Sequence, residues 1–159
     1  MIALPGLSQR ATAARRAYAA AVPGCKPGKT ASKGADMPAK VGYLVIDAAD
    51  PERLAEFWCD LLAVSVDMTI GAGEFLVLSP TEDGLTVGFQ RVAEPKAGKN
   101  RLHLDLIVES LDDSTAEIER LGGRWLEPGK TRELEGFLWR CMADPEGNEF
   151  DIDVLPADS

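Results

Sequence analysis

From Val41 onward, the spacing of the hydrophobic residues switches between the two-residue period of a β-strand and the longer period of an α-helix. Residues 41–47 have the pattern of a strand. Asp50, Pro51 and Glu52 then supply an N-cap, a proline suited to the first helical position and an acid in the first turn. The hydrophobic residues that follow share one helix face: Leu54, Phe57, Trp58, Leu61 and Leu62. Turn-forming residues separate the three strands predicted next: 64–70, 74–78 and 85–92.

The same order of elements is repeated after a polar linker at residues 94–100, which contains proline and glycine. Residues 101–109 have the pattern of a strand. Asp112 and Asp113 offer N-caps for a second helix, which ends at Gly122-Gly123. The apolar positions of this helix are Ala116, Ile118 and Leu121. The turn Asp144-Pro-Glu-Gly-Asn148 leads into the last of three further predicted strands: 124–127, 136–142 and 148–155.

This repetition indicates an internal duplication with a period of about 60 residues. We predict an α+β fold made of two tandem βαβββ modules with a largely antiparallel sheet. The predicted domain spans residues 41–155. It is divided as follows: module one 41–93, linker 94–100 and module two 101–155.

The first 40 residues differ in composition from the rest, being rich in Ala, Gly, Pro, Lys and Arg and poor in large apolar residues. Such a segment cannot bury enough surface to offset the entropy of ordering, so we predict a disordered basic extension over residues 1–40. Three interpretations stay open. Met37 directly precedes the pattern, which suggests a start-site artefact or a tail without function. The Arg-rich, acid-poor composition is also typical of a targeting segment, and a basic arm is the third interpretation.

Charge is divided unevenly along the chain. Residues 1–40 contain seven basic residues and one acidic residue, whereas residues 41–159 contain 10 basic and 25 acidic residues, a net of −15. A domain this acidic repels phosphate backbones, so nucleic acid is not an expected partner. No apolar run approaches the roughly 18 residues that a membrane span needs, so no membrane partner is expected either.

The three cysteines are Cys25, Cys59 and Cys141. They lie far apart, are odd in number and match no zinc-ligand spacing. Free thiols are typical of a reducing compartment, which predicts a cytoplasmic protein.

Three motifs carry a resemblance to a known family. They are Asp50-Pro-Glu-Arg-Leu-Ala-Glu-Phe-Trp58 after the first strand, Arg101-Leu-His-Leu-Asp-Leu106 at the start of the second module, and Asp144-Pro-Glu-Gly-Asn-Glu-Phe150 before the last strand. Together, in this order and over about 115 residues, they resemble the vicinal oxygen chelate superfamily, also called the glyoxalase/bleomycin-resistance/dioxygenase superfamily. The single-domain glyoxalase-like branch is the most similar.

The resemblance implies that the two modules form a curled mixed or antiparallel sheet around a cleft. Strand alternation then predicts which side chains pack and which face this cleft. The packed positions are Leu44, Ile46, Leu85, Val87, Phe89, Leu102, Leu104, Leu106, Phe150, Ile152 and Val154. The cleft-facing positions are Tyr43, Val45, Thr86, Gly88, Gln90, His103, Asp105, Ile107, Glu149, Asp151 and Asp153.

The resemblance implies up to four metal ligands, carried on the first and last strands of each module. The corresponding positions here are Tyr43, Gln90, His103 and Asp151. Metal-dependent members usually have His or Gln, Glu or His, His, and Glu at these positions. Tyrosine is a poor ligand and Gln90 a neutral one, so the set is incomplete. His103 and Asp151 are the predicted metal ligands, and the expected cofactor is either none or a divalent metal ion.

His103 is the only histidine in the chain. An iron site made of two histidines and one carboxylate therefore cannot be assembled within one chain. Extradiol dioxygenase activity is not expected unless a dimer brings a second His103 into the same cleft. The alternative for His103 is a hydrogen bond to Asp105, Asp151 or a backbone carbonyl.

The predicted last strand places Glu149, Asp151 and Asp153 on one face, where they repel one another unless a metal, solvent or a cationic ligand intervenes. Either a strand end facing water or a cleft suited to a cationic ligand would explain them. Trp139 alternates with apolar neighbours and is predicted to line a pocket, whereas Trp58 is predicted to lie in the core.

Two functions are compatible with these observations. The first is a domain that binds a small organic molecule without a complete metal site, resembling the ligand-sequestering proteins of the bleomycin-resistance type. The alternative is a divalent-metal-dependent lyase or isomerase of the glyoxalase type. In that case Glu149 and Asp151 are the candidate catalytic residues, with Gln90 as a further helper. The resemblance also implies a homodimer, because members of the superfamily often pair.

Overall fold

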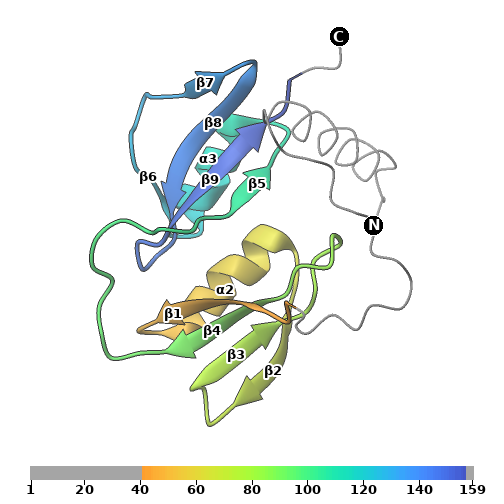
Figure 1. The fold of residues 1–159 in the computed structure, drawn as a ribbon, viewed down its shortest axis with the longest axis vertical. Helices are drawn as coiled ribbons and strands as arrows, with labels where there is room; N and C mark the ends of the chain where they lie inside the picture. The colour runs from red at the N-terminus through yellow and green to blue at the C-terminus, as the bar shows by residue number, and fades with distance from the viewer. Residues whose placement is uncertain (1–40, 157–159) are drawn as a thin grey trace, which may run out of the picture. The chain divides into compact units, whose positions relative to one another are not determined.

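The computed structural model describes residues 41–156. The predicted basic extension, residues 1–40, lies outside the described residues. Within residues 41–156, nine strands and two helices form two mixed sheets, each covered on one face by one helix (Figure 1). The prediction of an α+β fold with curled sheets is therefore confirmed.

The first module has the predicted order of strand, helix and three strands. Its elements are β1 (Leu44–Ala48), α2 (Pro51–Leu62), β2 (Val66–Ile70), β3 (Phe75–Leu78) and β4 (Val87–Arg91). The strands lie in the order β1-β4-β3-β2, with β1 parallel to β4 and the other pairs antiparallel. β1 is therefore an edge strand with one side free.

The second module repeats this order and adds one short strand. Its elements are β5 (Asp105–Ile107), α3 (Leu111–Arg120), β6 (Arg124–Trp125), β7 (Arg132–Leu134), β8 (Phe137–Ala143) and β9 (Glu149–Val154). The strands lie in the order β5-β9-β8-β6, and β7 pairs with the first three residues of β8, Phe137 to Trp139. β5 is parallel to β9 and, like β1, is an edge strand.

The sequence did not predict β7, which forms a hairpin with β8. The two residues between these strands, Glu135 and Gly136, both have positive φ angles, of 50° and 87°. This is the backbone of a two-residue hairpin turn whose twist matches the strands. Asn-Gly is the strong sequence signal for such a turn, and Glu-Gly is a weaker one.

Helix α2 forms as its sequence predicts. The Asp50 side chain accepts a hydrogen bond from the backbone N–H of Arg53 at 3.3 Å, and Pro51 is the first helical residue. The helix ends at Ala63, which has a left-handed conformation with φ 54°. Neither α2 nor α3 has the length and apolar character required to span a membrane.

Some local predictions for the second module were wrong. Leu102 was expected to pack but is 69% exposed, because the regular alternation of β5 begins only at Asp105. Ser110, rather than Asp112 or Asp113, caps α3 by accepting from the Asp113 N–H. The two aspartates lie in the first turn, where the helix dipole favours them. Thr115 takes the buried position beside Ile118, and Ala116 is exposed.

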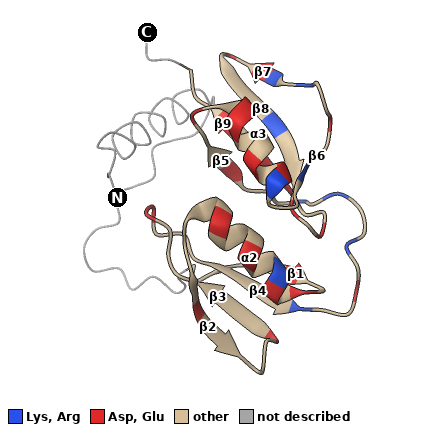
Figure 2. Cartoon of the chain, turned by 180° about the vertical axis from the view of Figure 1, so that it is seen from behind, with Lys and Arg blue, Asp and Glu red and all other residues tan. Residues whose placement is uncertain are grey.

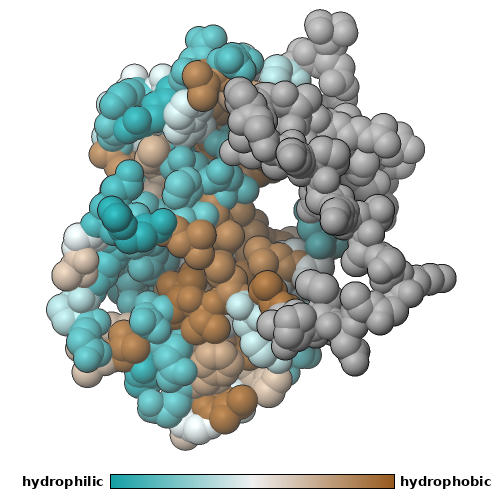
Figure 3. Space-filling model, viewed as in Figure 1, coloured by the Kyte–Doolittle hydropathy of each residue, from teal (hydrophilic) through white to brown (hydrophobic). Residues whose placement is uncertain are grey.

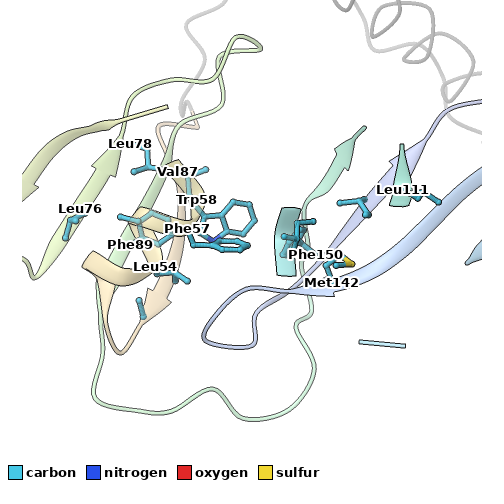
Figure 4. Close-up of a cluster of buried hydrophobic side chains, with 14 residues drawn as sticks. Leu54, Phe57, Trp58, Leu76, Leu78, Val87, Phe89, Leu111, Met142 and Phe150 are labelled. Atoms are coloured by element: carbon cyan, nitrogen blue, oxygen red, sulfur yellow. The ribbon is translucent and has the colours of Figure 1, made fainter. Parts of the chain in front are cut away.

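The core joins the two modules through aromatic side chains. Phe57 and Trp58 of α2 point across to Phe150 of β9 (Figure 4). The ring centroid of Phe150 lies 5.1 Å from that of Trp58 and 6.2 Å from that of Phe57. All three side chains are almost completely buried, so the prediction of a core role for Trp58 is confirmed.

The turn before β9 fastens the second module to the start of α2. The Glu146 carboxylate accepts from the backbone N–H groups of Ala49 and Asp50, at 2.8 and 2.7 Å. The buried Asp144 carboxylate accepts from the Trp58 indole N–H at 3.4 Å. Asp144 also accepts from two backbone N–H groups in its own turn and from the Asn148 side chain. This inter-module clamp, made by Asp144 and Glu146, explains the chemistry of the Asp-Pro-Glu-Gly-Asn turn.

Candidate functional site

The face of the first sheet turned away from α2 is open and apolar. Val45, Met68 and Ile70, from β1 and β2, are each about half exposed on it. Hydrophobic residues gather over this part of the surface in Figure 3, which looks at the sheet from the side opposite α2. This face carries few groups that could act as acids, bases or metal ligands.

The corresponding face of the second sheet is acidic. Strand pairing places Asp105 beside Asp151 and Ile107 beside Asp153. Alternation adds Glu149 to the same face of β9. The acidic residues of β5 and β9 are coloured red in Figure 2. The three carboxylates predicted from the sequence therefore share one face, with Asp151 next to His103.

His103 and two carboxylates form the most compact polar group on this face. The Nε2 atom of His103 lies 3.2 Å from an Asp105 oxygen and 3.9 Å from an Asp151 oxygen. One donor atom from each of the three residues can be chosen so that all lie within 4.8 Å of one another. The Asp151 side chain is largely covered, whereas those of His103 and Asp105 are about half exposed. These three residues are called the His103 group below.

Two carboxyls at this face, those of Asp105 and Asp153, have raised pKa values. The pKa of Asp153 is raised to about 7, first because of burial and then because Asp105 and Asp151 repel its charge. Burial is also the first cause of the raised pKa of Asp105. A carboxyl with a raised pKa stabilises the fold most when it is protonated. The contribution of Asp153 is therefore lost as the pH rises from its ordinary pKa of 3.8 through about 7.

Cys141 of β8 lies beside Asp151 of β9. Its pKa is raised to about 11, first by burial and then by the hydrogen bond that its thiol donates to Asp151. The thiolate is the reactive form of cysteine, and at neutral pH this side chain is a thiol. Cys141 is therefore a neutral hydrogen-bond donor to the His103 group.

A cavity of about 600 Å³ lies between β1 and the segment that leads into β5. Its apolar lining includes Leu44, Ile46, Trp58, Leu102, Leu104 and Phe150. Its polar lining consists of Asp47, Glu94, Lys96, Asn100, His103, Glu146, Asn148 and Glu149. Both modules and the linker contribute to this cavity, and His103 is the member of the His103 group that reaches it.

Glu149 is held by the linker. Its carboxylate accepts from the Asn100 backbone N–H at 2.8 Å and forms an ion pair with the Lys96 ammonium at 3.1 Å. Partial burial acts to raise its pKa, but these hydrogen bonds outweigh burial and hold the pKa below its ordinary value. Glu149 is thus an ionised residue of the cavity wall.

Residues 43–152 match the sequence profile of the family described as "Glyoxalase-like domain". The chain belongs to the glyoxalase-like domain family. The resemblance to the vicinal oxygen chelate superfamily, inferred from three sequence motifs, is thereby confirmed.

Solved structures share this fold. The oxidase ChaP-H2 has a TM-score of 0.56 at 20% identity, over 77% of this chain and 98% of that one. A glyoxalase/bleomycin resistance protein/dioxygenase family enzyme from Burkholderia phytofirmans PsJN has a TM-score of 0.54 at 16% identity, over 70% of this chain and 95% of that one. A glyoxalase-related enzyme from Fulvimarina pelagi has a TM-score of 0.55 at 18% identity, over 73% of this chain and 88% of that one. Among proteins with curated descriptions, none matches this chain in sequence.

In this glyoxalase-like domain, the residues predicted for one cleft are divided between several places. His103, Asp105 and Asp151 lie together. Gln90 donates to the Glu74 backbone carbonyl at 3.3 Å, within the first module, and Tyr43 does not line the cavity. Trp139 is half-buried on β8, opposite Asp153. The assignment of functional roles to these residues stays a prediction.

Sequence reasoning missed three residues that shape the glyoxalase-like cavity. Lys96 and Asn100 were assigned to a linker, yet both contact Glu149. The signal was weak, because a lysine in a polar linker is ordinarily a solvated side chain. Glu146 was expected only as part of a turn, whereas its carboxylate accepts from the backbone N–H groups of Ala49 and Asp50 in the other module.

Proposed function

We propose that this glyoxalase-like domain binds a small organic molecule in the cavity between its two modules. The observation that supports the proposal is the lining of that cavity, which combines an apolar surface with a few charged groups. Pockets for small molecules usually have this composition, with volumes of roughly 300–1,000 Å³. The cavity volume of about 600 Å³ lies within that range. Family membership supports either a binding domain or an enzyme.

A pair of exposed leucines provides a matched test. Leu102 lines the cavity and Leu134 does not, and they are 69% and 65% exposed. The neutral dye N-phenyl-1-naphthylamine is expected to bind the wild-type protein saturably, with increased fluorescence. Leu102→Gln should weaken dye binding about tenfold, because a leucine side chain contributes on this scale when it is covered. Leu134→Gln should have no effect. Equal effects of both variants, or the absence of saturable binding, would contradict the proposal.

Metal-dependent catalysis is a second candidate function, and the His103 group favours it. One imidazole nitrogen and two carboxylate oxygens suit a divalent ion such as Mn²⁺, Fe²⁺ or Zn²⁺. Three protein ligands leave positions for substrate or water, as in catalytic sites. His103, Asp105 and Asp151 would hold such an ion, which would polarise oxygen atoms of the substrate. Asp105 would be the third ligand of this site, in place of the first-module positions Tyr43 and Gln90 that the resemblance implied.

Co²⁺ titration tests the metal site by visible absorption, without an assay of activity. The wild-type protein is expected to bind Co²⁺ in a one-to-one ratio. Asp105→Asn should weaken binding by at least about a hundredfold, which is the upper end of the effect of losing an outer-shell partner. Asp67→Asn, an exposed aspartate of β2 outside the His103 group, is the control. If Asp105→Asn binds Co²⁺ like the wild type, the His103 group is not a metal site.

The cellular location and the assembly state remain predictions. Cys59 and Cys141 are free thiols, which favours a reducing compartment such as the cytoplasm. The homodimer implied by the superfamily, and sequestration of the ligand as the biological role, belong to the same proposal.

A further inference from the structure

The polar lining of the cavity is mostly negative. Four carboxylates contribute to it: Asp47, Glu94, Glu146 and Glu149. Lys96 is the one lysine or arginine among the lining residues of the described chain. Glu146 is committed to the inter-module clamp. Within residues 41–156, neither Asp47 nor Glu94 forms an ion pair. The cavity therefore has an excess of negative charge that its own residues leave uncompensated.

Lys96 places the single ammonium of the lining against one of these carboxylates. Its Nζ atom lies 3.1 Å from Glu149 and donates to the Gly98 carbonyl at 2.6 Å. The side chains of Lys96 and Glu149 are each only 21% exposed. The linker thus folds a cation back onto the cavity wall, where water screens it less than at the open surface.

The apolar part of the lining restricts what else could neutralise the carboxylates. Val45, Ile46 and several leucines border the same space, and Val45 and Leu102 are 47% and 69% exposed. A hydrated inorganic cation would leave this surface in contact with water, which is unfavourable in proportion to its area. A molecule that combines an apolar body with one positive charge matches both parts of the lining.

We infer that the cavity takes a monovalent organic cation with an apolar or aromatic body, and that Lys96 competes with the charge of this ligand for Glu149. This inference rests on the proposed function and names the chemical class of its ligand. The ligand's ammonium group displaces the Lys96 ammonium from Glu149, while its body covers Val45 and Leu102. Lys96 therefore lowers the affinity of the site for cations and has little effect on neutral molecules.

Two compounds of the same shape separate charge from apolar contact. The first is (2-naphthylmethyl)trimethylammonium, and the second is 2-neopentylnaphthalene, in which a carbon atom replaces the nitrogen. Each is titrated against the wild-type protein loaded with N-phenyl-1-naphthylamine, and displacement of the dye is measured. The cation is expected to bind about fivefold more tightly than the neutral compound, the usual upper size of one partly exposed charge pair.

Three variants test the competition. Lys96→Met keeps the length of the side chain and removes its charge, so it should raise affinity for the cation by about two- to fivefold. It should leave affinity for the neutral compound unchanged. Glu149→Gln can still accept from the Asn100 N–H and should reduce the preference for the cation. Lys99→Met, in the same linker but outside the cavity lining, should behave like the wild type.

The outcomes distinguish this inference from the proposed function. If both compounds displace the dye with equal affinity, the cavity binds small molecules but the inference is wrong. The inference is also wrong if Lys96→Met and Lys99→Met change cation binding equally, since that would be a general charge effect. If the dye binds but neither compound displaces it, the inference is wrong. If the dye itself does not bind saturably, the proposed function fails as well.

Discussion

Replacing Trp58 with alanine is expected to lower the free energy of unfolding by about 3–5 kcal/mol, the usual range for truncation of a large buried aromatic side chain. Trp58 is 1% exposed and lies between α2 and Phe150 of the other module. The substitution removes apolar contacts, opens a void at the junction of the modules and leaves Asp144 without its indole donor. Urea unfolding followed by circular dichroism would measure the loss.

Trp139→Ala is the matched control for Trp58→Ala. Trp139 is only half-buried and lies on β8, away from the aromatic junction. A clearly smaller loss is expected there, because less surface is covered and water can fill the space that is left. Equal losses at the two positions would show that the aromatic junction is not the main support of the domain.

Removing the Asp144 carboxylate is expected to cost about 3 kcal/mol or more. The side chain is completely buried and accepts from Trp58, from Asn148 and from the Glu146 backbone. Asp144→Ala leaves these donors without a partner, at about 1–3 kcal/mol for each that stays buried. The measurement is again urea unfolding. Asp83→Ala, an exposed turn residue, should change stability by less than about 0.5 kcal/mol.

The pH dependence of Asp144→Asn gives an independent check. Burial is the largest cause of the raised pKa of Asp144, and the hydrogen bonds it accepts only partly offset burial. Because the folded pKa is raised, the protonated form stabilises the fold most, and that contribution is lost as the pH rises through the folded pKa. The wild type should therefore lose stability relative to Asp144→Asn as the pH rises through the folded pKa of Asp144. A pH-independent difference between them would contradict the assigned burial cost.

Much of the fold could be predicted because local periodicity and tertiary packing agree. The helical spacing of Leu54, Phe57 and Trp58 is also the face that packs in the structure. Leu102 shows where the agreement ends. It continues the alternation of Leu104 and Leu106, but it precedes β5 and is exposed. A pattern of apolar residues does not specify where strand pairing begins.

The candidate site could be predicted within one module better than between modules. Asp105 and Asp151 are paired on the neighbouring strands β5 and β9, and His103 lies two residues before β5, so alternation and strand order suffice to bring them together. Tyr43 and Gln90 belong to the first module, and their distance from the His103 group depends on how the modules pack. That packing is decided by contacts such as Phe57 with Phe150, which are far apart in sequence. The contact of Lys96 with Glu149 is long-range for the same reason.

The inter-module clamp also has a consequence for synthesis of the chain. Ala49 and Glu146 are 97 positions apart, and Trp58 and Asp144 are 86 apart. At about 5–20 residues per second, the ribosome adds such a stretch in roughly 5–20 s. During that interval the first module has been made, but the acceptors for the start of α2 and for the Trp58 indole do not yet exist. The nascent first module therefore exposes an apolar aromatic surface until the last strand is translated. Chaperones would have most to protect during this interval.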